Sequence, residues 1–190
     1  LSREPFYPLF LAFFRKLFSS FPNDFYLTAV AFFQSGLMAF ATWTLVRYLW
    51  KELRLPKAVA FAVLAMPLGV SFLCRFAAKR ESMYSNSILT EGIVIALYLL
   101  FFRYLLEYCL HQNRKSLILS SILVFVMVST RKQMFMTLAL LIICILAVNI
   151  FHKKNFRGIG AAILCMLGIL SSSMLLDVGY NYILRGNAVR

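Results

Sequence analysis

The chain has 190 residues, of which 62% are hydrophobic and only 14% are charged, and its formal net charge is +13. A soluble domain of this length needs a polar shell, with about a quarter of its residues charged, so the composition excludes an ordinary water-soluble fold. Lys and Arg lie between apolar runs rather than along one soluble face, which argues against a nucleic-acid partner and favours membrane lipid or phosphate groups.

Residues 1 to 26 are predicted to lie at the membrane surface, ahead of the first long apolar run. The stretch from Pro8 to Phe18 is too short to cross a bilayer. Its aromatic residues, beside Arg15 and Lys16, are typical of a helix that lies in the interface between lipid and water.

The rest of the chain is predicted to cross the bilayer about six times. Crossing about 30 Å of hydrocarbon takes about 20 helical residues, and every backbone amide must be hydrogen-bonded within the segment. The predicted spans are 27 to 50, 57 to 74, 87 to 106, 116 to 129, 134 to 151 and 158 to 176, followed by an outer segment at 177 to 190. The expected fold is therefore all-α, a single polytopic transmembrane helix bundle over residues 1 to 190.

A tight turn is predicted between the fourth and fifth spans, at residues 130 to 133. One continuous helix through this region would place Arg131 and Lys132 deep in lipid, at a cost of about 2.5 to 3.5 kcal/mol per charge. A hairpin at the membrane surface avoids that cost.

The sixth span is rich in small residues, including Gly160, Gly168 and the run Ser171 to Ser173. Small side chains let helices approach closely. This span is therefore predicted to pack inside the bundle.

Six crossings divide the connections between two sides of a plasma membrane. One side holds the loops 47 to 57, 107 to 116 and 152 to 157, and the other holds 75 to 86, 130 to 133 and both ends. Lys and Arg are equally numerous on the two sides, so their count does not decide the orientation. The first side is assigned to the cytoplasm because basic residues crowd into each of its connecting loops.

Cations on the other, extracytoplasmic side run against the usual bias and are candidates for binding one anionic ligand, such as a lipid-linked phosphate. Guanidinium groups bind phosphate oxygens as a fork, and ammonium groups add a point charge. The alternative is that each charge sits in solvent at a helix end. The candidate cations for such a site are Arg75, Lys79, Arg80, Arg131, Lys132 and Arg185.

Two carboxylates lie at the same predicted face. Glu91 falls in the first turns of the third span, where it either interacts with the helix N-terminus or faces a cavity and orients a sugar hydroxyl or an Arg. Asp177 is predicted to mark the interfacial end of the last span rather than to act as a catalyst.

The four cysteines lie far apart in the sequence without a CxxC pair and are predicted to be buried free thiols. His111 and His152 have no carboxylate or Cys at ligand spacing, so metal binding through them is not expected. No cofactor is identified from the sequence, and a divalent metal stays open as a reaction partner.

Four strings resemble one family in the order in which that family has them. REPFYPLFLA resembles the R-x-P-G-Y-P-L-F-L-A segment of multispanning glycosyltransferases that use polyprenyl-phosphate sugars, the GT-C or family 39-like proteins, with Phe6 in place of glycine. SILTEGI is similar to the family's S-x-L-x-T/S-E segment, STRKQMF to its T-R-P-Q turn with Lys132 in place of proline, and GYNYILRGNAV to its R-N-Y-x-x-x-G-x-x-V stretch.

The resemblance implies transfer of a sugar from a polyprenyl-phosphate carrier to an acceptor on the extracytoplasmic face. It implies that Arg3 and Tyr7 lie beside the donor, that Glu91 lines the cavity and that Arg131 faces the carrier phosphate. The family's catalytic carboxylate lies in a first outer loop that would precede Leu1, so this chain alone is expected to be inactive. The candidate substrate-binding residues are Arg3, Tyr7, Arg75, Lys79, Arg80, Tyr84, Arg131 and Lys132.

Two other classes of membrane protein remain open for this chain. A multispanning transporter or flippase could hold an anionic or lipid-linked substrate with the same outer charges, but such proteins often show repeats and helices broken near mid-membrane. Here no repeat is visible, and Pro67 is the only obvious breaker within a span. A structural subunit would leave the outer cations unexplained.

Overall fold

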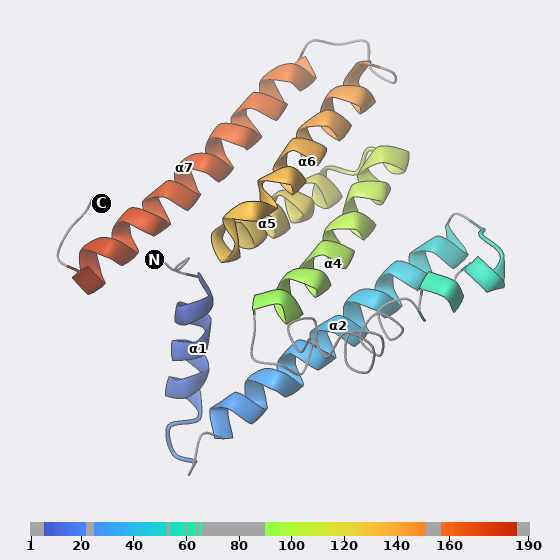
Figure 1. Cartoon of the computed structure of the whole chain (residues 1–190). Helices are drawn as coiled ribbons and strands as arrows, with labels where there is room; N and C mark the ends of the chain where they lie inside the picture. Colours follow the sequence, from blue (N-terminus) through green and yellow to red (C-terminus); the bar gives the residue numbers. More distant parts are fainter. Residues whose placement is uncertain are drawn as a thin grey trace. The chain divides into compact units, whose positions relative to one another are not determined.

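The structure is a computed structural model, and it describes residues 6–21, 25–52, 54–59, 61–63, 65, 90–150 and 157–185. Within these residues every regular element is a helix and no strand occurs, which confirms the predicted all-α class (Figure 1). The elements are α1 (Phe6–Leu17), α2 (Phe25–Lys51), α4 (Thr90–His111), α5 (Arg114–Thr130), the 3₁₀ turn η2 (Lys132–Met134), α6 (Phe135–Val148) and α7 (Arg157–Arg185).

Two of the described helices are long and apolar enough to cross a membrane, namely α2 and the Gly92–His111 part of α4. The apolar parts of the later helices, Lys132–Val148 and Met166–Tyr180, are shorter. Most of the predicted span at 57 to 74 lies outside the described residues. Six crossings therefore stay a prediction.

The described residues form two compact units, divided at Pro8 within α1 and at Arg103 within α4. In the unit made by residues 9 to 103, α2 buries one stripe of side chains, spaced three, four or seven residues apart, as expected for one face of a helix. This stripe contains Val30, Gln34, Ala41, Leu45 and Tyr48.

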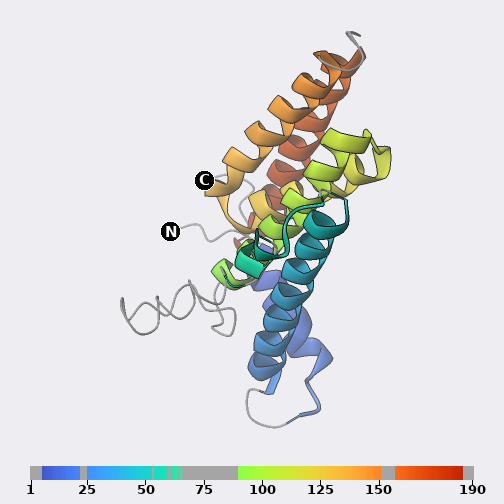
Figure 2. The ribbon, with the colours of Figure 1, turned by 90° about the vertical axis from the view of Figure 1, so that its right-hand side faces the viewer.

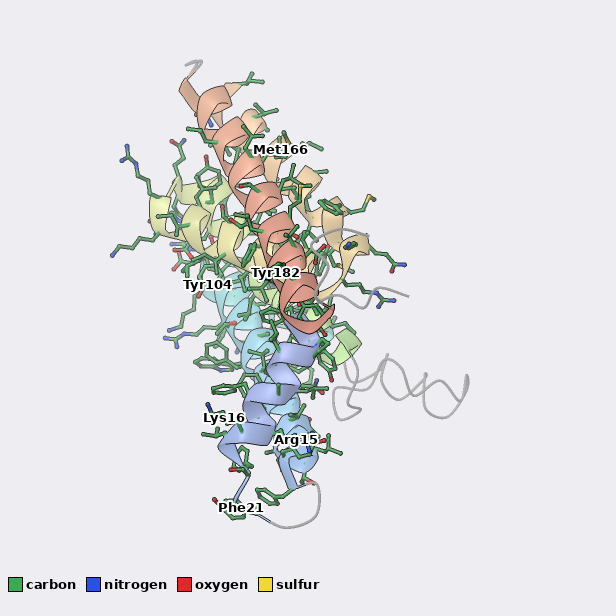
Figure 3. All side chains as sticks on the ribbon, turned by 90° about the vertical axis from the view of Figure 1, so that its left-hand side faces the viewer. Arg15, Lys16, Phe21, Tyr104, Met166 and Tyr182 are labelled. Carbon is green, nitrogen blue, oxygen red and sulfur yellow. The ribbon has the colours of Figure 1, made fainter. Side chains whose placement is uncertain are left out.

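Aromatic rings hold α1 against the first turns of α2. With 12 residues, α1 is about 18 Å long, which is too short to cross a bilayer. The ring centre of the buried Phe14 lies 5.5 Å from that of Phe33 and 4.9 Å from that of Phe10. The ring centres of Phe18 and Phe25 lie 5.6 Å apart. Arg15 and Lys16 are exposed near the end of α1 (Figure 3).

In the other unit, α5, η2 and α6 form a helical hairpin that packs against α7 (Figures 1 and 2). Asn113 begins α5, because its side-chain oxygen accepts a hydrogen bond from the backbone N–H of Lys115 at 3.0 Å. The helix ends at Thr130, where Arg131 adopts an extended conformation, and a single 3₁₀ turn leads into α6. The predicted break between the fourth and fifth apolar runs is confirmed.

The last helix differs from the sequence-based expectation in two ways. It continues past residue 176 to Arg185, so Asp177 lies inside the helix rather than at its end. The small-residue face is not interior, because Gly168 and Ser171 are exposed, and a Cβ atom added at Gly168 would meet no atom within 4 Å. Small side chains permit close packing but do not drive it, and among the described side chains of α7 only Ile169 is buried.

Candidate functional site

The candidate residues fall into two groups with respect to the described part of the chain. Arg3, Arg75, Lys79, Arg80 and Tyr84 lie outside the described residues. Tyr7, Arg131 and Lys132 lie inside them, and the backbone of Glu91 forms part of the first turn of α4.

Tyr7 is buried in the first turn of α1, so its side chain belongs to the packing of that turn. Lys132 opens η2 directly after Arg131, and the structure thus places both cations in the turn between α5 and α6.

The turn carries an ion pair with the last helix. The Lys132 ammonium lies 3.0 Å from an Asp177 carboxylate oxygen, and the side chains are 57% and 27% exposed. We call Arg131, Lys132 and Asp177 the hairpin cluster. Its two cations and one carboxylate leave one net positive charge next to apolar helices.

Backbone geometry fixes this turn. The Arg131 N–H donates to the Met127 carbonyl at 2.8 Å, and the Met134 N–H donates to the Arg131 carbonyl at 2.9 Å. The extended Arg131 between two hydrogen-bonded turns therefore has a defined backbone position, which places the adjacent Lys132 within reach of α7.

Three residues with hydroxyl groups are buried at the turn or within one helical turn of it. Thr130 donates from Oγ1 to the Val126 carbonyl, and Thr137 donates from Oγ1 to the Met134 carbonyl, each at 2.6 Å. Ser129 is also buried, and its Oγ has no hydrogen-bond partner among the described residues. An unsatisfied buried hydroxyl is costly, so Ser129 is a group that a ligand oxygen or a water molecule would stabilise.

The sequence predicts Asp177 as the interfacial end of the last span and does not predict its ion pair with Lys132. One signal was present: Asp177 is the only acidic residue after Glu107. A carboxylate in an apolar segment needs a cation, and the cations assigned to the same side include Arg131 and Lys132 of the turn as well as Arg185.

Three further side-chain contacts lie away from the turn. The Arg103 guanidinium of α4 lies over the Tyr48 ring of α2, 5.5 Å from its centre, and within α2 the Arg47 guanidinium lies 5.2 Å from the centre of the Trp43 ring. At the far end of α4, Cys109 contacts Cys144 of α6 through a hydrogen bond between their side chains. Both thiols are free, as predicted, but the prediction that they are buried is wrong, because both are partly exposed.

In the described ranges, no group of three or more His, Cys, Asp or Glu side chains is placed to hold a metal ion. Asp177 contributes a single carboxylate, which Lys132 already contacts. The hairpin cluster is thus suited to binding an anion rather than a cation.

No family model, no curated protein and no solved structure matches the chain.

Proposed function

We propose that the chain is part of a multispanning membrane glycosyltransferase that takes a sugar from a polyprenyl-phosphate carrier, and that the hairpin cluster binds the carrier phosphate on the extracytoplasmic face of the plasma membrane. The observation that carries the proposal is the Lys132–Asp177 ion pair beside Arg131. It places two cations at the tip of an apolar hairpin, and a phosphate can replace the carboxylate as the partner of Lys132. The resemblance of STRKQMF to the family's T-R-P-Q turn falls on these residues.

The exposed surface supports a lipid environment. Large apolar side chains stand out from several helices, among them Phe32 of α2, Met136 of α6 and Leu175 of α7, which are 72% to 79% exposed. Exposed apolar side chains repeated along whole helices mark a surface that lipid or another protein covers. This applies to α6 and α7 as well as to the two longest helices.

Helix direction supports a crossing between α2 and α4. In the unit of residues 9 to 103, α2 and the first part of α4 run the same way (Figures 1 and 2), and Arg103 reaches Tyr48 near the end of α2. The chain between two parallel helices must return along their length. The predicted span at 57 to 74 would cover about 27 Å at 1.5 Å per residue, which suits such a return.

Two contacts in the other unit support alternating crossings. Cys109 and Cys144 bring together the ends of α4 and α6, and Lys132 and Asp177 bring the α5–α6 turn to α7. The first contact joins segments assigned to the cytoplasmic side, and the second joins segments assigned to the opposite side.

The ion pair gives the cluster a simple mode of action. Asp177 occupies one direction of approach to the Lys132 ammonium when no phosphate is present. A carrier phosphate offers several oxygens and more negative charge, so it competes with the carboxylate for Lys132 while Arg131 contributes a guanidinium fork. The Lys132 side chain is more than half exposed, so a headgroup can reach it.

Cations at this position would assist the chemical step. When the bond between the sugar and the phosphate breaks, negative charge grows on the leaving phosphate, and fixed cations stabilise that charge more than they stabilise the bound donor. The general base belongs, by the family resemblance, to an outer loop, and Glu91 remains the candidate cavity carboxylate.

The test uses the full-length protein and a labelled polyprenyl-phosphate sugar. Arg131→Ala is expected to lower transfer at least about tenfold, because one charge-assisted contact to phosphate is worth about 1.5 to 3 kcal/mol. Arg114→Ala, an exposed cation at the other end of α5, is the matched control and should leave transfer near the wild-type value.

Three outcomes separate the function classes. Loss of transfer in Arg131→Ala but not in Arg114→Ala supports the transferase. Equal transfer in wild type and Arg131→Ala removes Arg131 from the site. Movement of the lipid-linked sugar across vesicles without transfer supports the flippase alternative.

A further inference from the structure

A pair of thiols joins the C-terminal halves of α4 and α6. Cys109 lies in the last turn of α4, and Cys144 lies four residues before the end of α6. Both are free and partly exposed, and the side chain of Cys109 is hydrogen-bonded to that of Cys144. Two thiols from different helices are thus in direct contact, although 35 positions separate them in the sequence.

A neighbouring contact holds the same two chain segments in register. The buried Tyr108 is hydrogen-bonded to the side chain of Asn149, the residue that ends α6. Asn149 is itself fixed, because its Nδ2 donates to the Ile145 carbonyl at 2.7 Å. This second hydrogen bond lies beside the contact between Cys109 and Cys144, so two neighbouring residues of α4 each contact the C-terminal part of α6.

We infer that Cys109 and Cys144 form a reversible dithiol–disulfide site that reacts with low-molecular-weight disulfides of the glutathione class. The thiolate of one cysteine attacks a sulfur of the small disulfide, whose S–S bond breaks and releases one thiol. The second cysteine then attacks the mixed disulfide and releases the other thiol. The protein loses two electrons and two protons, and the small disulfide becomes two thiols.

Oxidation would close a loop that contains the hairpin. The chain from Cys109 to Cys144 includes all of α5, the η2 turn and most of α6, so the new bond would tie α4 to the hairpin that carries Arg131 and Lys132. A covalent cross-link restricts the unfolded chain and stabilises the folded one. On the side assigned to the cytoplasm, glutathione would keep the site reduced until the local thiol–disulfide balance shifts.

The experiment treats the full chain, in lipid nanodiscs, with glutathione disulfide, blocks remaining thiols with N-ethylmaleimide and maps peptides by mass spectrometry. We expect one major cross-linked peptide pair, joining Cys109 to Cys144, which dithiothreitol removes. Its rate of formation should exceed that of any pair with Cys74 or Cys165 at least about tenfold, because Cys109 and Cys144 are already in contact in the folded protein. The oxidised protein should unfold at a higher temperature than the reduced protein.

Single variants complete the test. Cys165→Ser should retain the cross-link at the wild-type rate. Cys109→Ser should abolish it and leave Cys144 as a mixed disulfide with glutathione, and Cys144→Ser should give the reverse. The inference is overturned if wild-type Cys109 and Cys144 are modified separately without a cross-link, or if pairs with Cys74 or Cys165 form equally fast.

Discussion

The Lys132 ammonium lies 3.0 Å from the Asp177 carboxylate, and this ion pair ties the turn between α5 and α6 to the last third of α7. The pair is partly exposed, so its contribution to stability is small, on the order of 0 to 1 kcal/mol. Its importance is electrostatic, because Asp177 sets how much of the charge on Lys132 is available to another anion.

Removing the carboxylate should strengthen phosphate binding. Asp177→Asn keeps the size of the side chain but releases the Lys132 ammonium, and we expect polyprenyl phosphate to bind about two to five times more tightly, which corresponds to an interaction of up to about 1 kcal/mol. The measurement is titration of the purified protein with polyprenyl phosphate in detergent. Asp177→Glu keeps the charge and should bind as the wild type does.

Weaker binding by Asp177→Asn would contradict this account of the ion pair. It would mean that the carboxylate holds Lys132 in the binding position rather than competing with the phosphate. Raised salt should weaken both the ion pair and phosphate binding, since both are partly exposed charge contacts.

The Ser129 hydroxyl at the same turn is expected to affect protein stability and phosphate binding differently. Because its buried Oγ makes no hydrogen bond within the described structure, Ser129→Ala should leave the free energy of unfolding unchanged or raise it by up to about 1 kcal/mol. If Ser129 donates to the bound headgroup, the same variant should weaken polyprenyl phosphate binding. Equilibrium unfolding and the titration above measure the two effects.

Thr130→Val is the matched comparison for Ser129→Ala. It keeps the shape of the side chain but removes the hydrogen bond from Oγ1 to the Val126 carbonyl. We expect a loss of stability of about 0.5 to 1.5 kcal/mol. A larger loss in Ser129→Ala than in Thr130→Val would show that the Ser129 hydroxyl has a partner in the folded protein.

The sequence was enough to predict the hairpin but not its partner. The cost of burying Arg131 and Lys132 in lipid follows from those two residues alone, and the break between α5 and α6 is local. The pairing of Lys132 with Asp177 depends on the register of α7 against the hairpin. No local pattern determines that register.

The same reason explains two other differences. Cys109 and Cys144 meet because of how α4 and α6 pack, and their spacing in the sequence gives no sign of it. The apolar run ends near residue 176, but no proline follows, so α7 continues to Arg185. The aromatic α1, by contrast, follows from length and composition, as the sequence predicted.

Phe14 should hold α1 to α2. It is the most buried phenylalanine of α1, and its ring lies near Phe10, Phe18 and Phe33. Phe14→Ala should cost about 3 to 5 kcal/mol of packing and release α1, which limited proteolysis would detect as faster cleavage between α1 and α2. Leu17→Ala, at an exposed position of the same helix, should be cleaved at the wild-type rate.

The orientation of the hairpin can be tested with single cysteines in a variant that lacks the four native ones. The proposed crossings put Lys132 on the extracytoplasmic side and Lys115, at the other end of α5, on the cytoplasmic side. Both side chains are exposed, so neither reaction is limited by burial.

A membrane-impermeant maleimide added to whole cells should label Lys132→Cys at least about tenfold faster than Lys115→Cys, because the hydrocarbon core blocks the reagent. Opening the cells should remove the difference. Equal labelling in whole cells would mean that α5 does not cross the bilayer. Labelling of Lys115→Cys alone would invert the assignment of sides. The hairpin cluster would then lie on the cytoplasmic side, away from any extracytoplasmic sugar acceptor.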